Sequence, residues 1–229
     1  MVNCEKCRNY ETEKCIYCEH FDRDLDDYYE PDEELAQREE ELQKAQLEAC
    51  VVGTMETDVP AELADTIARL TQFTDRKHFR FPAVYCGQDE LIATDGVTLV
   101  RVRQHVPAQL IDKYVLETGP GTVKLAKHYP DNIIPKCHEF LNIGKSNTKF
   151  VVKYDEIFNK ASLGWGHIEL TFADLTIAFD KDRLLKALSL LDGCQSIKVY
   201  WPAENIQAVL FEAGNTEVEV LVMPVRTRS

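Results

Sequence analysis

Four of the eight cysteines lie within fifteen residues and form two Cys-x2-Cys pairs: Cys4 with Cys7, and Cys15 with Cys18. Two intervening residues let both thiolates of a pair reach one ion at about 2.3 Å, and the seven-residue loop returns the chain to complete a tetrahedral Zn²⁺ site. A closed four-thiolate site is structural rather than catalytic. Because residues 1–20 offer almost no apolar core, bound metal would supply their folding energy. We predict a structural zinc knuckle over residues 1–20.

Other assignments for this cluster stay open. The thiols could instead be redox-active dithiols or ligands of an iron–sulfur cluster, and His20 could replace one cysteine. The sequence has no apolar signal-peptide stretch at its start, and paired spacing in such a chain favours metal over disulfides. The other cysteines stand far apart, and we expect each to be buried singly: Cys50, Cys86, Cys137 and Cys194.

The remaining residues show no spacing typical of catalysis. The six histidines form no HxH or HExxH pattern, and no P-loop, GxGxxG or GxSxG motif occurs. Cys137 and His138 are adjacent, but adjacent side chains rarely face each other as nucleophile and base. We expect a protein that is not an enzyme, with a hydrolase that uses the histidines as a further hypothesis.

The negative charge is concentrated in one segment. Of the formal net charge of −13, residues 21–48 carry twelve acidic and three basic residues, a net −9. Beyond residue 48 there are 23 acidic and 20 basic residues, a net −3. The overall acidity argues against a wholly basic nucleic-acid coat, yet the nearly neutral remainder leaves room for a basic face.

The composition predicts a globular, cytoplasmic protein. The hydrophobic fraction of 45% excludes wholesale disorder, and 229 residues are enough for one sizeable core. No window approaches 18 consecutive apolar residues, so we expect no membrane association. Residues 21–52 are acidic, and their helix-prone part, 32–50, has a thin apolar stripe at Leu35, Leu42 and Ala49. A solvated linker helix or a short coiled-coil seam fits this stripe.

Beyond residue 53 a helix followed by three strands occurs twice, at about 60–104 and 180–225. Leu63, Ile67 and Leu70 fall on one face of the first helix, and Asp180 or Asp182 can cap the second. The strands expected in the first repeat are 79–86, 90–94 and 98–104. Those of the second are 196–201, 207–212 and 216–225, preceded by two strand-like pieces within 167–179.

Such a duplication predicts two half-modules that pack against each other. Residues 105–166 between them are less regular. We expect a loop at 118–121, short strands at 123–127 and 150–154, and irregular structure at Tyr129–Pro135.

Two short motifs resemble the DNA polymerase III beta sliding clamps of bacteria, which are processivity factors. The stretch Leu91–Leu99 (LIATDGVTL) resembles the clamp ATDG turn, and Val220–Arg226 (VLVMPVR) resembles the clamp C-terminus. Both occur in the expected order within the duplicated pattern. The resemblance implies an α+β fold in which duplicated helix-plus-three-strand half-modules form one sliding-clamp-like (DNA clamp) domain at 53–229. An N-terminal zinc-binding knuckle and an acidic linker helix at 21–52 precede it.

The resemblance also implies functional surfaces. Clamp helices line the DNA channel, which would assign DNA contacts to Arg69, Lys181, Arg183 and Lys186. Basic side chains opposite a leucine stripe also simply solvate a helix, and Glu62 and Asp65 would repel phosphate.

Clamps receive short peptides from polymerases in an apolar groove near the C-terminal motif, which would assign Met223, Pro224 and Val225 to that groove. The family builds this groove from two neighbouring domains, of which one is expected to be missing here. These residues could instead simply finish an edge strand and its core. A clamp subunit has three domains and closes a ring as a dimer, so a ring here would require several copies.

The resulting hypothesis is a non-catalytic accessory of DNA replication or repair, with DNA, a DNA polymerase or another replication protein as partners and a homo-oligomer as one assembly. The alternative is a zinc-dependent protein–protein adaptor or regulator that uses the clamp-like fold without binding DNA, which the charge of −13 favours.

Overall fold

The computed structural model describes residues 51–75, 81–126, 133–163, 166–214 and 217–225, together with five residues between 37 and 45. The chain divides into two compact units, Met1–Ala49 and Cys50–Ser229. In the first unit the five described residues are helical and lie inside the segment predicted to be a helix: Gln37, Arg38, Glu41, Leu42 and Ala45. The predicted zinc knuckle and its four cysteines lie outside the described residues.

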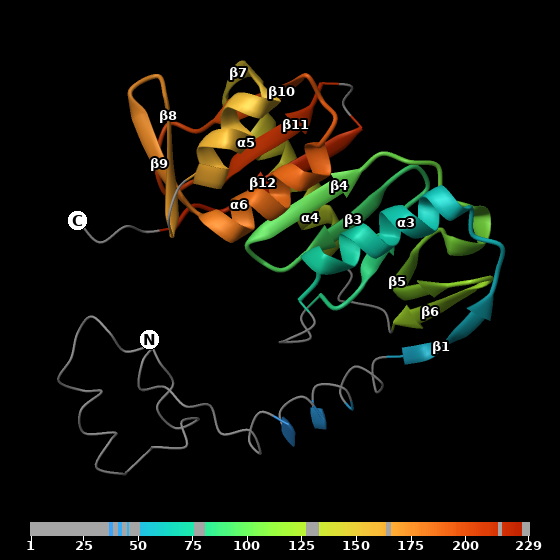
Figure 1. Cartoon of the computed structure of the whole chain (residues 1–229). Coiled ribbons are helices and arrows are strands. Elements are labelled where there is room, and N and C mark those ends of the chain that lie inside the picture. Colours follow the sequence, from blue (N-terminus) through green and yellow to red (C-terminus); the bar gives the residue numbers. More distant parts are fainter. Residues whose placement is uncertain are drawn as a thin grey trace, which may run out of the picture. The chain divides into compact units, whose positions relative to one another are not determined.

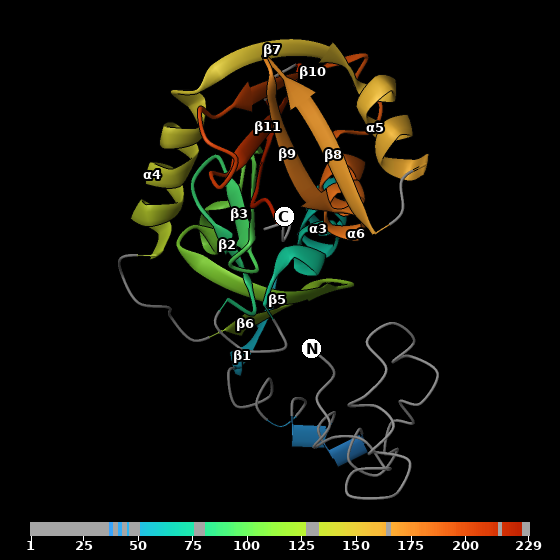
Figure 2. The same ribbon diagram turned by 90° about the vertical axis from the view of Figure 1, so that its left-hand side faces the viewer.

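A ten-stranded antiparallel sheet runs through the second unit, in the order β1-β6-β5-β2-β3-β4-β12-β11-β10-β7 (Figure 1). A separate hairpin, β8–β9, packs across the end of the sheet that holds β10 and β11 (Figure 2). The strands of the sheet are β1 (Val51–Glu56), β2 (Val84–Cys86), β3 (Leu91–Thr94), β4 (Thr98–Val102), β5 (Lys113–Gly119), β6 (Thr122–Ala126), β7 (Thr148–Lys153), β10 (Ser196–Trp201), β11 (Val209–Ala213) and β12 (Val218–Val222), and those of the hairpin are β8 (His167–Phe172) and β9 (Leu175–Asp180).

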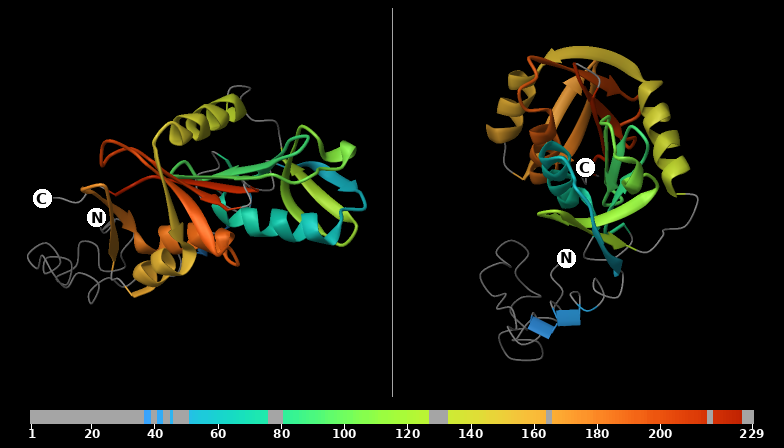
Figure 3. Two further views of the ribbon diagram at one scale, coloured as in Figure 1. Left: turned by 90° about the horizontal axis from the view of Figure 1, so that it is seen from above. Right: turned by 90° about the vertical axis from the view of Figure 1, so that its right-hand side faces the viewer.

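The helices lie on opposite faces of this sheet. Viewed from above, α3 and α6 follow one another along one face with α5 beside α6, while α4 lies on the opposite face (Figure 3). No helix of the described residues is long and apolar enough to cross a membrane. The α-helices are α3 (Ala61–Leu70), α4 (Ile133–Lys145), α5 (Tyr154–Leu163) and α6 (Lys181–Leu188), and short 3-10 turns occupy 71–73, 108–110 and 189–191.

The predicted duplication is confirmed. The first half-module is α3 followed by β2, β3 and β4, and the second is α6 followed by β10, β11 and β12. The two join where β4 pairs antiparallel with β12, with Val100 opposite Val220. One continuous sheet therefore crosses both half-modules.

Local sequence signals explain both repeated helices. In α3 the predicted residues Leu63, Ile67 and Leu70 are buried, since their spacing places them on one helical face. Of the two residues predicted to cap α6, the cap is Asp180, whose Oδ1 accepts a hydrogen bond of 2.9 Å from the backbone N–H of Arg183, and Asp182 lies in the first turn.

The main core lies between the sheet and the layer formed by α3, α5, α6 and the β8–β9 hairpin. Aromatic rings join its layers: the centroids of Phe172 and Trp201 are 4.7 Å apart, and those of Phe179 and Phe211 are 6.2 Å apart. Both Phe179 and Phe211 are fully buried. The apolar faces predicted for the two half-modules are therefore covered within the second compact unit, Cys50–Ser229.

The segment between the repeats differs most from expectation. The prediction of irregular structure up to Pro135 is wrong at its end, because α4 begins at Ile133 and holds Pro135 in its first turn, where a missing N–H costs no helical hydrogen bond. Residues 118–119 extend β5 rather than forming a loop, and α5 was not predicted. The strand expected over 79–86 is shorter, since β2 covers Val84–Cys86 only.

Candidate functional site

The turn between β3 and β4 holds one apolar side chain at the surface. Asp95 Oδ1 accepts hydrogen bonds from the backbone N–H groups of Val97 (3.0 Å) and Thr98 (2.6 Å). Gly96 has φ of +86°, a conformation that glycine adopts without strain. The predicted tight turn is confirmed, and it leaves Val97 37% exposed.

The C-terminal segment 223–225 connects this turn to the β8–β9 hairpin. The backbone N–H of Met223 donates to the carbonyl oxygen of Val97 (2.9 Å), and the N–H of Val225 donates to the carbonyl oxygen of Ala178 on β9 (2.9 Å). Pro224 between them has no N–H to satisfy. The segment thereby holds Met223 beside Val97 with its side chain 39% exposed.

An apolar cavity of about 480 Å³ opens between the β3–β4 turn, the first turns of α4 and Met223. We call it the anchor cavity. One charged residue, Lys136, is among the described residues that line it. The others are apolar, small or hydroxyl-bearing: Phe81, Thr94, Gly96, Val97, Thr98, Leu99, Ile133, Cys137, Phe140, Ala208, Leu221 and Met223.

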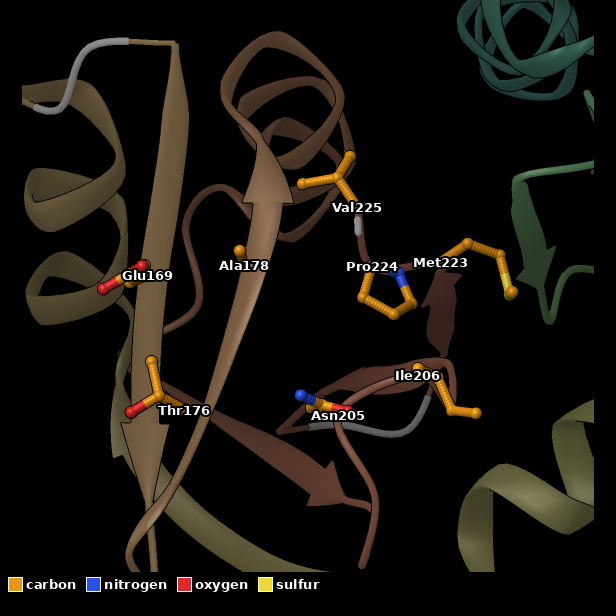
Figure 4. A pocket seen from close by; sticks show the side chains of 8 residues that line it. All are labelled: Glu169, Thr176, Ala178, Asn205, Ile206, Met223, Pro224 and Val225. Atoms are coloured by element: carbon orange, nitrogen blue, oxygen red, sulfur yellow. The ribbon is translucent and has the colours of Figure 1, made fainter. Parts of the chain in front are cut away.

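A second cavity of about 460 Å³ adjoins the first across Met223. We call it the hairpin cavity. Figure 4 shows the C-terminal segment opposite the hairpin residues Glu169 and Ala178. Because Met223 lines both cavities, the two form neighbouring compartments of one surface. The hairpin cavity is lined by Glu169, Thr176, Ala178, Asn205, Ile206, Met223, Pro224 and Val225.

Helix α4, which forms one wall of the anchor cavity, rests on a small second core. Cys137 and Leu141 of the helix pack there against side chains of β3, β4, β11 and β12. Gly144 permits the close approach, since a Cβ at this position would lie 3.1 Å from both Leu210 Cβ and Leu221 Cδ1. The sheet residues of this core are Ile92, Leu99, Leu210 and Leu221.

Beside this core, α4 is held by buried charges. Lys145, in its last turn, places Nζ 2.5 Å from Glu219 Oε1 and 3.4 Å from Glu212 Oε2. Glu219 is fully buried and also accepts from Arg101 Nε at 2.8 Å. Glu212 is 2% exposed and accepts from Lys198 Nζ at 2.6 Å. We call these five residues the ionic cluster, and they join α4 to β4, β10, β11 and β12.

The charges of the ionic cluster stabilise the ionised form of Glu212. Burial alone would raise the pKa of this carboxyl, but the hydrogen bond from Lys198, the charges of Lys145 and Lys198 and the hydrogen bond from Tyr200 together lower it. Tyr200 shows the opposite response, since burial and the neighbouring Glu212 raise the pKa of its phenol to about 12.

Cys137 and His138 contact different parts of the molecule. The Cys137 thiol is buried against the sheet, and its burial, assisted by Glu90, raises its pKa to about 11. The Nε2 atom of His138 lies 2.7 Å from Glu90 Oε1 instead. The two side chains therefore form no nucleophile–base pair. Of the cysteines expected to be buried singly, Cys86 and Cys137 are buried and Cys194 is partly buried, and Cys50 lies outside the described residues.

The four residues assigned to DNA by resemblance lie on α3 and α6, on the same face of the sheet. Two of them contact the other half-module. Arg69 Nη2 donates to the carbonyl oxygen of Ser189 (3.2 Å), and Lys186 donates to the carbonyl oxygen of Gln72 and lies 4.8 Å from the ring centroid of Phe73. Lys181 and Arg183 are partly exposed at the start of α6.

The three residues assigned to a peptide groove lie together. Met223 lines both cavities, whereas Pro224 and Val225 line the hairpin cavity. We expected one of the two domains that build the family's groove to be missing. In the structure the β3–β4 turn lies beside the C-terminal segment, because β4 pairs with β12, and the assignment of Met223, Pro224 and Val225 to a peptide groove stays a prediction.

The sequence did not reveal the α4 side of the anchor cavity. Ile134, Cys137, Leu141 and Gly144 recur at helical spacing, but a cysteine and a glycine on the inner face weaken the apolar signal. Phe140 also lines the anchor cavity and is 53% exposed. The position of Pro135 in the first turn was the signal that could have located this helix.

Comparisons with known proteins show the fold. No protein-family model matches the chain, and no curated protein is similar to it. Among solved structures, the Helicobacter pylori beta clamp in complex with 3,4-difluorobenzamide has a TM-score of 0.53 at 13% identity, covering 76% of this chain and 66% of that chain. The same clamp bound to a DNA ligase peptide has a TM-score of 0.50 at 14% identity, with the same coverage.

A sliding clamp (DNA polymerase III subunit beta) from Bartonella birtlesii bound to griselimycin has a TM-score of 0.48 at 16% identity, covering 72% of this chain and 65% of that chain. This chain spans just under two thirds of the length of the clamps it matches. The mixed helix and sheet structure is that of the bacterial beta sliding clamps, which confirms the fold that the two motifs implied.

Proposed function

We propose that this protein is a non-catalytic accessory of DNA replication or repair, whose clamp-like domain binds a short apolar peptide segment of a partner protein. One observation carries the proposal: the β4–β12 pairing places Val97 and Met223 on a common apolar cavity with Phe140. All three side chains are more than a third exposed and meet at this cavity, a pattern typical of a binding site. The matched clamp that holds a DNA ligase peptide supports a peptide as the ligand.

A fluorescence anisotropy titration tests this proposal. The probe peptide is labelled and capped at both ends, with a central Leu-Phe pair, a lysine towards its N-terminus and an aspartate towards its C-terminus. We expect Met223→Glu and Val97→Glu each to weaken binding about tenfold or more, because a charge would enter an apolar site. Val151→Glu, on the exposed edge strand β7, serves as the control. Equal binding by all these variants would contradict the proposal.

A second candidate function is the protein–protein adaptor that binds no DNA. The contacts of Arg69 and Lys186 with the other half-module favour it, because part of the basic charge on the helical face already has partners there. Binding of the full chain to duplex and primed DNA over a salt series separates the two functions. Binding that weakens with salt and with Lys181→Glu and Arg183→Glu supports DNA contact, whereas no binding at low salt supports the adaptor.

We also propose that Cys4, Cys7, Cys15 and Cys18 hold one structural Zn²⁺. The support is their spacing, since these residues lie outside the described part of the chain. Metal analysis of the purified full chain should find about one zinc per chain, lost in Cys7→Ala and kept in Cys194→Ala. Iron in place of zinc would contradict this assignment.

The assembly is a further element of the proposal. Among the described strands, β1 and β7 lie at the two edges of the sheet, and edge strands can join copies of a chain. Mass measurement in solution, with and without DNA, tests a ring directly. A monomer under both conditions would rule a ring out.

A further inference from the structure

The inference concerns the charged side chains at the two cavities, and it rests on the peptide-binding function proposed above. Lys136 is exposed on α4 and is the one charged residue among those that line the anchor cavity. Glu169 is exposed on β8 and is the one charged residue among those that line the hairpin cavity. The two compartments, which share Met223, therefore carry opposite charges.

Both charges lack an ion-pair partner within 4.0 Å among the described residues. Two described acidic residues on the elements that form this cavity, Glu139 on α4 and Asp95 in the β3–β4 turn, have other surroundings. Glu139 lines a shallow hollow on the outer side of α4, and Asp95 uses its carboxylate to hold the β3–β4 turn. Lys136 is thus available to a ligand in the anchor cavity.

We propose that the bound peptide carries an acidic side chain next to its apolar anchor, facing Lys136, and a basic side chain in the hairpin cavity, facing Glu169. The apolar lining supplies most of the binding energy, and the two rim charges fix which end of the peptide enters which compartment. Charge complementarity selects this occupant over a purely apolar segment, which would leave both rim charges unused.

A double-mutant cycle between protein and probe peptide tests the contact at Lys136. Replacing the peptide aspartate by asparagine should weaken binding to the unchanged protein about threefold to fivefold, in the range expected of exposed ion pairs. The same peptide change should have no effect on Lys136→Gln. Lys136→Glu should weaken binding of the acidic peptide about tenfold, and this loss should shrink as salt is raised.

The contact at Glu169 has its own cycle. Replacing the peptide lysine by glutamine should weaken binding to the unchanged protein about threefold and leave Glu169→Gln unaffected. Two charge reversals away from both cavities serve as matched controls: Lys149→Glu on β7 and Asp58→Lys before α3, each exposed. Neither should alter the response to either peptide change.

The outcomes separate this inference from the function beneath it. If the probe binds and Met223→Glu abolishes binding, but both cycles show no coupling, the charge assignment is overturned and the peptide site stands. If the controls respond as strongly as Lys136→Glu, the effect comes from net charge and the assignment is likewise overturned. If the unchanged protein binds no version of the probe, the proposed function itself fails.

Discussion

On one face of the ten-stranded sheet, α3, α6 and the β8–β9 hairpin cover a continuous apolar core. On the other face, α4 rests partly on four apolar residues of the sheet and partly on the ionic cluster. Burial of apolar surface stabilises the first face, and this stabilisation does not depend on pH or on the orientation of any single group. The second requires every buried charge to keep its partner. The anchor cavity lies beside the second face, so its α4 wall depends on the more specific set of contacts.

The largest expected effect is on the apolar face. Phe211→Ala removes a fully buried ring that packs against Phe179, and we expect a loss of about 3–5 kcal/mol in the free energy of unfolding. Urea denaturation measures it. The loss should be the same at pH 6 and pH 8, because the described contacts of the Phe211 ring are with apolar side chains. A loss that depends on pH would contradict the view that apolar burial alone stabilises this face of the sheet.

A slightly smaller effect is expected on the ionic face. Glu219→Gln keeps the shape of the side chain but leaves Arg101 and Lys145 without their shared anion, and we expect a loss of about 3 kcal/mol. The matched control is Glu139→Gln on the exposed side of α4, with an expected change within about 0.5 kcal/mol. If urea denaturation gives equal losses of unfolding free energy for Glu219→Gln and Glu139→Gln, the ionic cluster does not stabilise α4 on the sheet.

Gly144→Ala tests the close approach of α4 to the sheet. The new Cβ would lie 3.1 Å from both Leu210 and Leu221, so these side chains or the helix must move by a few tenths of an ångström, and we expect a loss of about 2 kcal/mol. Binding of the probe peptide should weaken as well, because α4 forms one wall of the anchor cavity. Gly53→Ala, at a position with nothing within 4 Å of the added Cβ, is the control. A stabilised variant would show that the helix can adjust freely.

The smallest expected effect is the acid sensitivity of Glu212. Its pKa in the folded protein lies below the ordinary value of 4.5, so its contribution is fully present above about pH 4.5 and is lost as the pH falls through the lower, folded value. We expect the difference in unfolding free energy between the unchanged protein and Glu212→Gln to be constant from pH 6 to pH 8 and to shrink on acidification below pH 4.5. Urea denaturation at a series of pH values measures it. A difference that grows in acid would contradict the sign.

Much of the fold could be predicted because its signals are local. Leu63, Ile67 and Leu70 mark a buried helical face within eight residues, and Asp180 caps a helix that begins at the next residue. The turn of Asp95 and Gly96 is complete within five residues. Each of these requires only the chain's own neighbouring residues, so the sequence pattern is sufficient.

The α4 wall and the ionic cluster could not be predicted in this way. The charge of Glu212 and Glu219 favours solvent-facing positions in their strands. They are buried because Lys145, from a helix more than sixty residues earlier in the chain, covers them. Their burial is favourable only together with their partners. No pattern within either strand contains that information.

The sequence by itself determined the two half-modules, their helical faces, the β3–β4 turn and the order of motifs that resembles the sliding clamps. The tertiary structure decided that β4 pairs with β12, that α4 lies on the face opposite α3 and α6, and that Val97, Phe140 and Met223 meet at one cavity. The physical reason is the separation in sequence between the residues that make contact. Turns, caps and amphipathic faces are fixed by neighbouring residues, whereas a cavity is fixed by the surfaces that remain after distant strands have found their partners.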